Sequence, residues 1–193
     1  MSERKALPHA IAIGASAGGV DALSALLQAL PAVYPAALLV VQHRVSTDDD
    51  ALLTRLFARR CALPVKEAED KEAILPGTVY LAPPDYHMLV EPNATLALSR
   101  VEPVHFSRPA IDPLFESAAM AYRERLLAIV LSGASVDGAA GLRQVRGCGG
   151  QAWVQDPTDA TAQAMPAQAL ALSGADRVLP LAQLAKALGK LFP

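Results

Sequence analysis

The chain has 193 residues, a length that favours one domain and is sufficient for a large buried core. Hydrophobic residues make up 52% of the chain and charged residues 19%, a composition that excludes a disordered protein. The formal net charge is -2, which argues against nucleic acid or an anionic membrane as a partner. The apolar runs are too short to span a bilayer and residues 1–10 hold no signal-peptide core, so we expect a cytoplasmic protein.

The first sixty residues predict two buried strands, each followed by a helix. Ala10–Gly14 and Ala36–Gln42 are continuous apolar runs, which are typical of parallel strands covered on both faces. Apolar residues at helical spacing predict a helix over Gly18–Leu30. A second helix is predicted over Ala51–Arg60, with the polar residues Ser46–Asp50 as its cap.

The middle of the chain differs, because short alternating runs are separated by Pro-Gly, Pro-Pro and Pro-Asn turns. This pattern predicts antiparallel strands over Thr78–Leu81, His87–Val90 and Thr95–Ser99. A proline-rich loop, Glu102–Pro109, then leads to a helix over Asp112–Arg123.

The parallel pattern returns in the last third. Further strands are predicted over Leu126–Leu131, Gly150–Gln155 and Arg177–Leu179, and helices over Gly138–Val145, Pro166–Leu172 and Pro180–Leu191. The alternation predicts an α/β fold: a doubly wound, mostly parallel sheet flanked by helices, with an antiparallel β-hairpin insert. We expect residues 1–193 to form a single domain.

Three polar side chains follow three of the predicted parallel strands: Ser16 in "GASAGG", His43 in "QHR" and Asp137 in "SGASVDG". The carboxyl ends of parallel strands meet at one edge of a sheet, so these side chains form the inventory of a Ser-His-Asp triad. Ser16 also stands in a Gly-x-Ser-x-Gly pattern on a strand-turn-helix. We expect Ser16 Oγ to lie within hydrogen-bond reach of His43 Nε2, with the Asp137 carboxylate orienting the ring.

A nucleotide-binding turn is the main alternative for the same glycine-rich segment. A dinucleotide fingerprint needs Gly-x-Gly-x-x-Gly, but Ser16 stands where the middle glycine should be. The end of the second strand carries Gln42, His43 and Arg44, with no acid to hold a ribose. No Gly-Lys-Ser/Thr follows either, so the nucleophile hypothesis is favoured, while a simple packing turn stays open.

Each candidate also has a structural interpretation. Asp137 is equally suited to be the N-cap of the helix that follows it, and Arg108 is suited to pair with Asp112 at the surface. His9, His87 and His105 are rivals to His43, but they lie in a terminus, a hairpin and a loop. The residues Cys61 and Cys148 lack ligand spacing, and no cluster has it, so we predict reduced cysteines and no metal.

Six segments carry a family resemblance: "IAIGASAGG", "VVQH", "VKEAEDKEAILPGTVYLAPPDYHM", "RPAIDPLFESAA", "IVLSGASVDGAAG" and "AMPAQAL". They fall in order over about His9 to Leu191. On these residues the chain resembles the catalytic domain of the chemotaxis protein-glutamate methylesterases, the CheB family, without the receiver domain that typical members carry. Whether the chain is a stand-alone form or a fragment stays open.

The resemblance implies hydrolysis of γ-glutamyl methyl esters on the cytoplasmic helices of chemoreceptors, with release of methanol, and deamidation of certain receptor glutamines. It places the triad on Ser16, His43 and Asp137 and the oxyanion hole on the backbone amides of Ala17 and Ala134. It implies no cofactor. The partners expected are methylated receptors and a separate response regulator or signalling protein, and we expect a monomer.

The chain departs from the family pattern beside the nucleophile. Ala17 replaces a threonine, and Ala134 replaces a methionine in Ser132-Gly133-Ala134-Ser135. An amide donor survives either change, but the pocket wall becomes smaller. Two alternatives to the receptor esterase therefore stay open: another serine acyl hydrolase on the same scaffold, and a non-catalytic signalling module.

Overall fold

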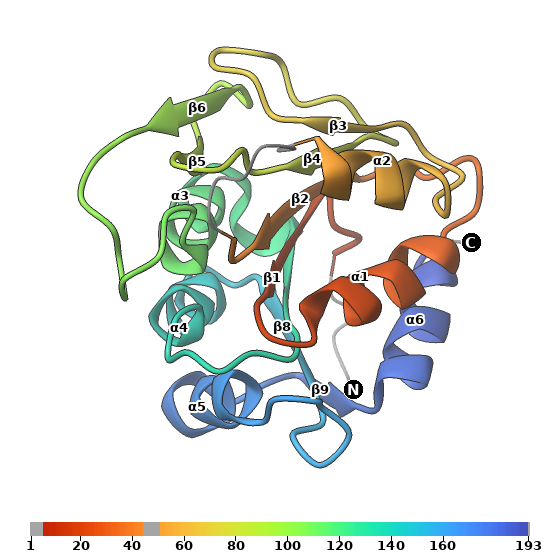
Figure 1. The fold of residues 1–193 in the computed structure, drawn as a ribbon, viewed down its shortest axis with the longest axis vertical. Coiled ribbons are helices and arrows are strands. Elements are labelled where there is room, and N and C mark those ends of the chain that lie inside the picture. Colours follow the sequence, from red (N-terminus) through yellow and green to blue (C-terminus); the bar gives the residue numbers. More distant parts are fainter. Residues whose placement is uncertain (1–5, 45–50, 193) are drawn as a thin grey trace.

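A computed structural model describes residues 6–44 and 51–192 (Figure 1). Its centre is a seven-stranded sheet with the strand order β3-β4-β2-β1-β7-β8-β9, in which every pair is parallel. The strands of this sheet are β1 (Ala10–Ala15), β2 (Ala37–Gln42), β3 (Val65–Glu67), β4 (Val79–Leu81), β7 (Leu126–Val130), β8 (Gln151–Gln155) and β9 (Arg177–Leu179). The predicted mostly parallel α/β fold is confirmed.

The central strands are buried along their whole length. Every residue of β1, β2 and β7 is buried, as their continuous apolar sequences require. Helices cover the sheet on both faces. They are α1 (Gly19–Gln28), α2 (Leu52–Ala58), α3 (Ile111–Tyr122), α4 (Ala139–Gly147), α5 (Ala164–Ser173) and α6 (Leu181–Gly189).

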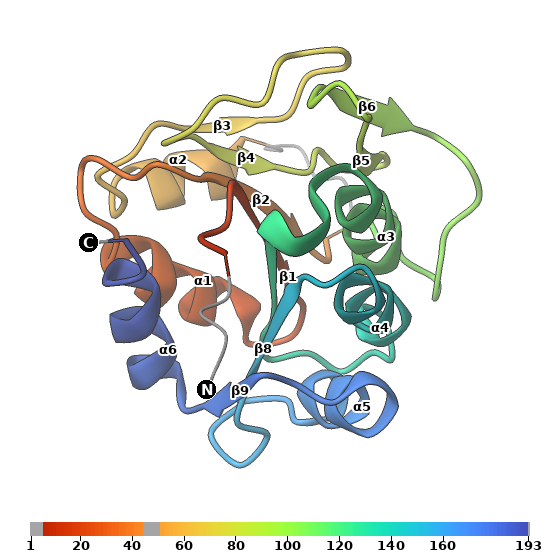
Figure 2. The ribbon, with the colours of Figure 1, turned by 180° about the vertical axis from the view of Figure 1, so that it is seen from behind.

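The two faces of the sheet have separate hydrophobic cores. Figures 1 and 2 show α3, α4 and α5 on one face and α1 and α6 on the other. On the first face, Phe115 and Leu142 pack with Met165 in one buried cluster. On the second face, Leu23 of α1 packs with Leu184 of α6 and with Trp153 in the other cluster. Burial on both faces holds the sheet as a rigid platform for its carboxyl edge.

The direction of the chain reverses beside β1. From β1 the chain passes through α1 to β2 on one side, whereas β7 pairs with the other side of β1. Such a topological switch point opens a crevice outside the carboxyl ends of the strands, where α/β proteins place their sites. The turns that follow β1, β2 and β7 therefore define the functional region.

The predicted direction of β4 was wrong, and β3 was not predicted from the sequence. β4 was expected to be antiparallel, but it pairs in parallel with β2 and β3. Both β3 and β4 have only three residues, which is too short for an alternation pattern to reveal direction. The hairpin insert is confirmed as the antiparallel pair β5 (His87–Val90) and β6 (Leu96–Ser99). The predicted cap at Ser46–Asp50 lies outside the described residues.

Candidate active site

Ser16 occupies a tight turn between β1 and α1. Its amide donates to Ser132 O at 2.9 Å, and its carbonyl accepts from Gly19 N at 2.8 Å. The turn requires glycine at position 18, where φ is +74° and a Cβ would lie 2.6 Å from Thr161 Cβ. The predicted strand-turn-helix around Ser16 is therefore present, and the side chain follows directly after the last buried residue of β1.

His43 lies beside Ser16 because β1 and β2 pair in parallel. Ala15 is opposite Gln42 in the register, so the next residue on each strand is Ser16 and His43. The Gln42 side chain links the two turns: its Nε2 donates to Ser16 O at 2.9 Å and to His43 O at 3.0 Å. This amide is buried and fills the space beside Gly19, where a Cβ would lie 2.2 Å from Gln42 Oε1.

Asp137 comes from the turn after β7 and is fully buried. Its Oδ2 accepts from the His43 imidazole Nε2 at 2.7 Å and from Ile111 N at 2.6 Å. Its Oδ1 accepts from Asp112 N and Gly138 N, both at 2.9 Å. The carboxylate thus lies on the N-terminus of α3, where backbone N–H groups and the helix dipole stabilise negative charge.

These contacts decide the charge state of Asp137. Burial alone raises the pKa of the carboxyl, but the hydrogen bonds from His43 and from the amides of Ile111 and Asp112 outweigh it and lower the pKa. An ionised carboxylate only accepts hydrogen bonds, so His43 Nε2 carries the proton and donates it. The alternative of Asp137 as N-cap of its own helix was wrong, because Gly138 occupies that position in α4.

The imidazole presents the opposite nitrogen from the one predicted. Nε2 is taken by Asp137, so Nδ1 faces the open side of the site. Among the described residues, Ser16 Oγ makes no hydrogen bond, and the hydroxyl near Nδ1 is that of Ser107, at 3.4 Å. Ser16, His43 and Ser107 line one cavity of about 420 Å³. The structure therefore contains the His–Asp half of the predicted triad and places Ser16 on the same cavity.

The two predicted oxyanion amides lie in the turns after β1 and β7. Within the described chain, the amides of Ala17 and Ala134 donate no hydrogen bond, and Ala134 lines the cavity that contains Ser16. The carbonyl of Ala17 is fixed, because it accepts a 2.7 Å hydrogen bond from Ser132 Oγ. Both amides are therefore free to donate, and N–H groups that point at a developing oxyanion stabilise it.

The sequence model of the CheB methylesterase family matches residues 11–188. The chain belongs to the CheB methylesterase family. A curated relative from Leptospira interrogans is 42% identical over 178 residues, which cover 92% of each chain. The protein-glutamate methylesterase/protein-glutamine glutaminase of Bordetella pertussis is 41% identical over 184 residues, 91% of this chain and 51% of that longer protein. The crystal structure of the Thermotoga maritima CheB methylesterase catalytic domain superimposes with a TM-score of 0.90 at 31% identity, covering 97% of this chain and 100% of that one.

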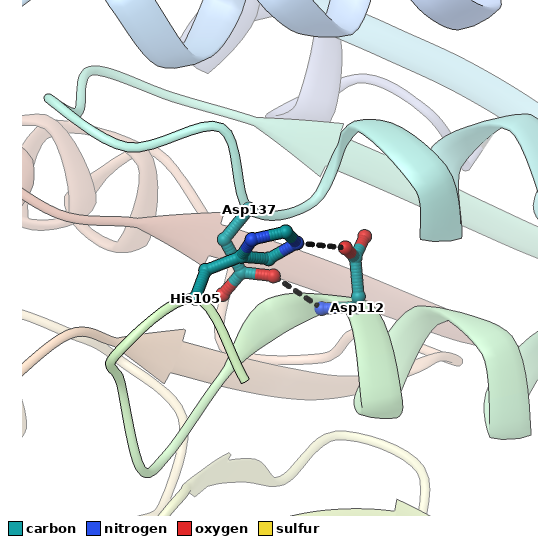
Figure 3. Close-up of side chains that lie close together, drawn as sticks. All are labelled: His105, Asp112 and Asp137. Carbon is teal, nitrogen blue, oxygen red and sulfur yellow. Dashed lines mark hydrogen bonds and ion pairs between the residues drawn. The ribbon is translucent and has the colours of Figure 1, made fainter. Parts of the chain in front are cut away.

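Sequence reasoning missed a second acidic group in this CheB-family site. His105 Nε2 lies 3.3 Å from Asp112 Oδ2, and Asp112 N donates to Asp137 (Figure 3). Burial raises the pKa of Asp112, as does the nearby charge of Asp137, although a hydrogen bond from Gly141 N acts in the opposite direction. The two carboxyls thus differ: Asp137 is held ionised and Asp112 is biased towards its neutral form.

The same three side chains are the described residues that come closest to a metal site. One ligand atom from each of His105, Asp112 and Asp137 lies within 4.8 Å of the others. Both oxygens of Asp137 already accept two N–H groups each, so hydrogen bonding accounts for the cluster. Sequence spacing did not show this grouping, because the loop, α3 and the turn after β7 meet only in the folded chain.

The remaining sequence hypotheses have simple outcomes. Arg108 does not pair with Asp112; its Nη1 donates to the carbonyls of Arg100 and Val101. His87 is buried in β5 and accepts from a backbone amide, away from Ser16. His105, treated as a loop residue, lines the same cavity as Ser16. The two cysteines are free and half-buried.

Proposed function

We propose that this chain is a protein-glutamate methylesterase that hydrolyses γ-glutamyl methyl esters on methyl-accepting chemoreceptors, releases methanol and also deamidates receptor glutamines. One observation carries the proposal: the buried Asp137–His43 pair presents Nδ1 to a cavity that Ser16 lines. The named activity of the Bordetella pertussis relative, a protein-glutamate methylesterase/protein-glutamine glutaminase, supports the substrate class.

In the first step, His43 Nδ1 accepts the proton of Ser16 Oγ as the oxygen attacks the ester carbonyl. Asp137 holds Nε2–H and stabilises the imidazolium that forms, without being protonated itself. The amides of Ala17 and Ala134 receive the oxyanion, and each such donor contributes on the order of 10²–10³ in rate. When the tetrahedral intermediate collapses, the methoxy group takes the proton from Nδ1 and leaves as methanol.

In the second step, water attacks the acyl-enzyme. His43 Nδ1 removes a proton from the water, the same two amides hold the second oxyanion, and Ser16 leaves with that proton restored. A glutamine substrate follows the same route, with ammonia as the leaving group. The Ser16–His43 hydrogen bond that both steps need forms on substrate binding, as catalytic hydrogen bonds often tighten only in the complex.

The wider assignment follows from the same residues. We propose that residues 1–193 form one catalytic domain, supported by the seven-stranded sheet that contains both β1 and β9. Its partners are methylated receptor helices, and a separate response regulator or signalling protein is the proposed regulator. We propose a cytoplasmic monomer. No helix of the described residues is long and apolar enough to cross a membrane.

A second acyl-hydrolase function is favoured by one feature, the small side chains at Ala17, next to Ser16 in the sequence, and at Ala134, which lines the Ser16 cavity. A substrate panel separates the two. The receptor esterase predicts faster methanol release from a methylated receptor fragment than from short neutral methyl esters, compared by kcat/KM. Preference for a short ester would support the alternative, and no fluorophosphonate labelling at Ser16 would support a non-catalytic module.

A further inference from the structure

A two-residue hairpin turn projects over the candidate site. Val104 and Ser107 exchange both backbone hydrogen bonds, Val104 N to Ser107 O at 3.1 Å and the reverse pair at 2.9 Å. Between them, His105 has φ +49° and Phe106 has φ +62°. Positive φ at both central residues is the type I′ turn, which favours Asn-Gly. His105 is among the residue types that tolerate a positive φ, whereas the bulky Phe106 is poorly suited to that backbone.

Burial of the side chain does not compensate for the unfavourable backbone conformation of Phe106. Its side chain is fully exposed, so it contributes no burial, and an aromatic residue is disfavoured in the left-handed region. A residue that is unfavourable in conformation and unfavourable in exposure indicates a role outside folding. Strain of this kind is typically found where the surrounding structure holds a residue for binding or catalysis.

The position of Phe106 relates it to substrate. It lines the cavity of about 420 Å³ that contains Ser16 and His43, and also the adjoining cavity of about 370 Å³. The second cavity shares His43 with the first, but its lining includes Asp85 and Arg108 and does not include Ser16. A short ester bound at Ser16 therefore has no group to fill it. Val136, half-exposed, lines the first cavity on the side of the turn after β7. Phe106 and Val136 are thus the large apolar side chains of a cavity whose other lining residues are small or polar.

We propose that Phe106 is a specificity-determining residue that packs on apolar side chains of the methylated receptor helix next to the scissile ester. The proposal rests on the function proposed above and names the surface by which this site distinguishes a protein substrate from a small ester. The proposed binding partner at Phe106 is an amphipathic receptor helix. Its modified glutamate enters the Ser16 cavity, and the helix residues one turn away from that glutamate contact Phe106.

The test uses substitutions that suit the turn better than phenylalanine does. Phe106→Gly and Phe106→Asn relieve the positive φ, so the melting temperature should be unchanged or higher. With a methylated receptor fragment, KM should rise roughly 10- to 100-fold, the effect of losing one buried phenylalanine, with kcat little changed. With a short neutral ester, the kcat/KM of these two variants should stay within about twofold of wild type. Phe106→Tyr, which keeps the aromatic ring, should have a receptor KM close to that of wild type.

Val33→Asn is the matched control, because Val33 is also a highly exposed apolar residue but precedes β2, at the opposite edge of the sheet. An unchanged receptor KM in Phe106→Gly, or an equal loss on both substrates, would overturn the role of Phe106 alone. A change in sedimentation on Phe106→Gly would show a second copy as occupant and overturn it as well. If the wild-type chain acts on the short ester but releases no methanol from the receptor, the proposed function fails, and with it this role.

Discussion

Replacing Asp137 by asparagine tests how the buried carboxylate works. The two oxygens of Asp137 accept four N–H groups, two on each oxygen. An amide of the same shape has only one oxygen, so its NH₂ group must face two of these donors. If the NH₂ occupied the Oδ1 position, it would oppose the amides of Asp112 and Gly138, and both would lose their acceptor.

The other orientation is less costly and has a specific consequence. With the NH₂ at the Oδ2 position, only the amide of Ile111 loses its acceptor, because His43 can change tautomer and accept at Nε2. The ring then carries its proton on Nδ1, the nitrogen that must receive the proton of Ser16. In serine hydrolases this tautomer exchange lowers kcat by about 10⁴.

The stability effect follows from the same count. One buried donor without an acceptor costs about 1–3 kcal/mol. For a chain of this size 1 kcal/mol corresponds to about 2–4 °C, so the melting temperature of Asp137→Asn should fall by roughly 2–12 °C. The variant should therefore be folded and inactive. The assays are methanol release under saturating substrate, calorimetry, and ¹⁵N NMR of the His43 ring. A folded variant that keeps kcat within tenfold of wild type would refute the reasoning.

Two further variants test neighbouring groups. Gln42→Leu removes the donor to Ser16 O and His43 O while keeping a side chain of similar volume. The kcat for a short ester should fall about tenfold or more, and the melting temperature should change by only a few degrees. An unchanged kcat would show that the link between the turns has no positioning role. Asp112→Asn keeps an acceptor for Gly141 N and removes a carboxyl whose pKa is raised in the folded state. Between the ordinary pKa and the raised one, the folded state binds more protons at this group than the unfolded state does. Stability from this group therefore falls as pH rises above the ordinary Asp pKa of about 3.9, and urea unfolding from pH 4 to 8 should show the variant gaining stability relative to wild type as pH rises. A variant that loses stability relative to wild type over that range would contradict this sign.

The sequence was sufficient for the part of the site that depends on strand order. Parallel strands end at one edge, so Ser16, His43 and Asp137 were predicted as neighbours from three strand ends alone. The structure places all three at the edge beside the switch point, and it shows the His43–Asp137 contact directly. The strand positions themselves followed from continuous apolar runs, which leave little choice about what is buried.

The rest depends on contacts between distant segments. Whether Nε2 or Nδ1 of His43 meets Asp137 is set by the ring orientation, which no sequence pattern encodes. Asp112 and His105 join the site because α3 and the preceding loop pack on the turn after β7, whose Asp137 is 25 residues from Asp112 in the sequence. The direction of β4 could not be predicted either, because a three-residue strand shows no period. Each failure concerns a tertiary choice that local propensity leaves open.

The most direct test of the central claim is methanol release from a methylated receptor fragment by wild type, Ser16→Ala and Ser107→Ala. Both hydroxyls lie on the His43 cavity, and Ser107 Oγ lies 3.4 Å from His43 Nδ1, so Ser107→Ala is the matched control. The account predicts that Ser16→Ala abolishes release and fluorophosphonate labelling, whereas Ser107→Ala keeps activity within about tenfold of wild type. Full activity in Ser16→Ala, or a fluorophosphonate adduct on Ser107, would contradict it.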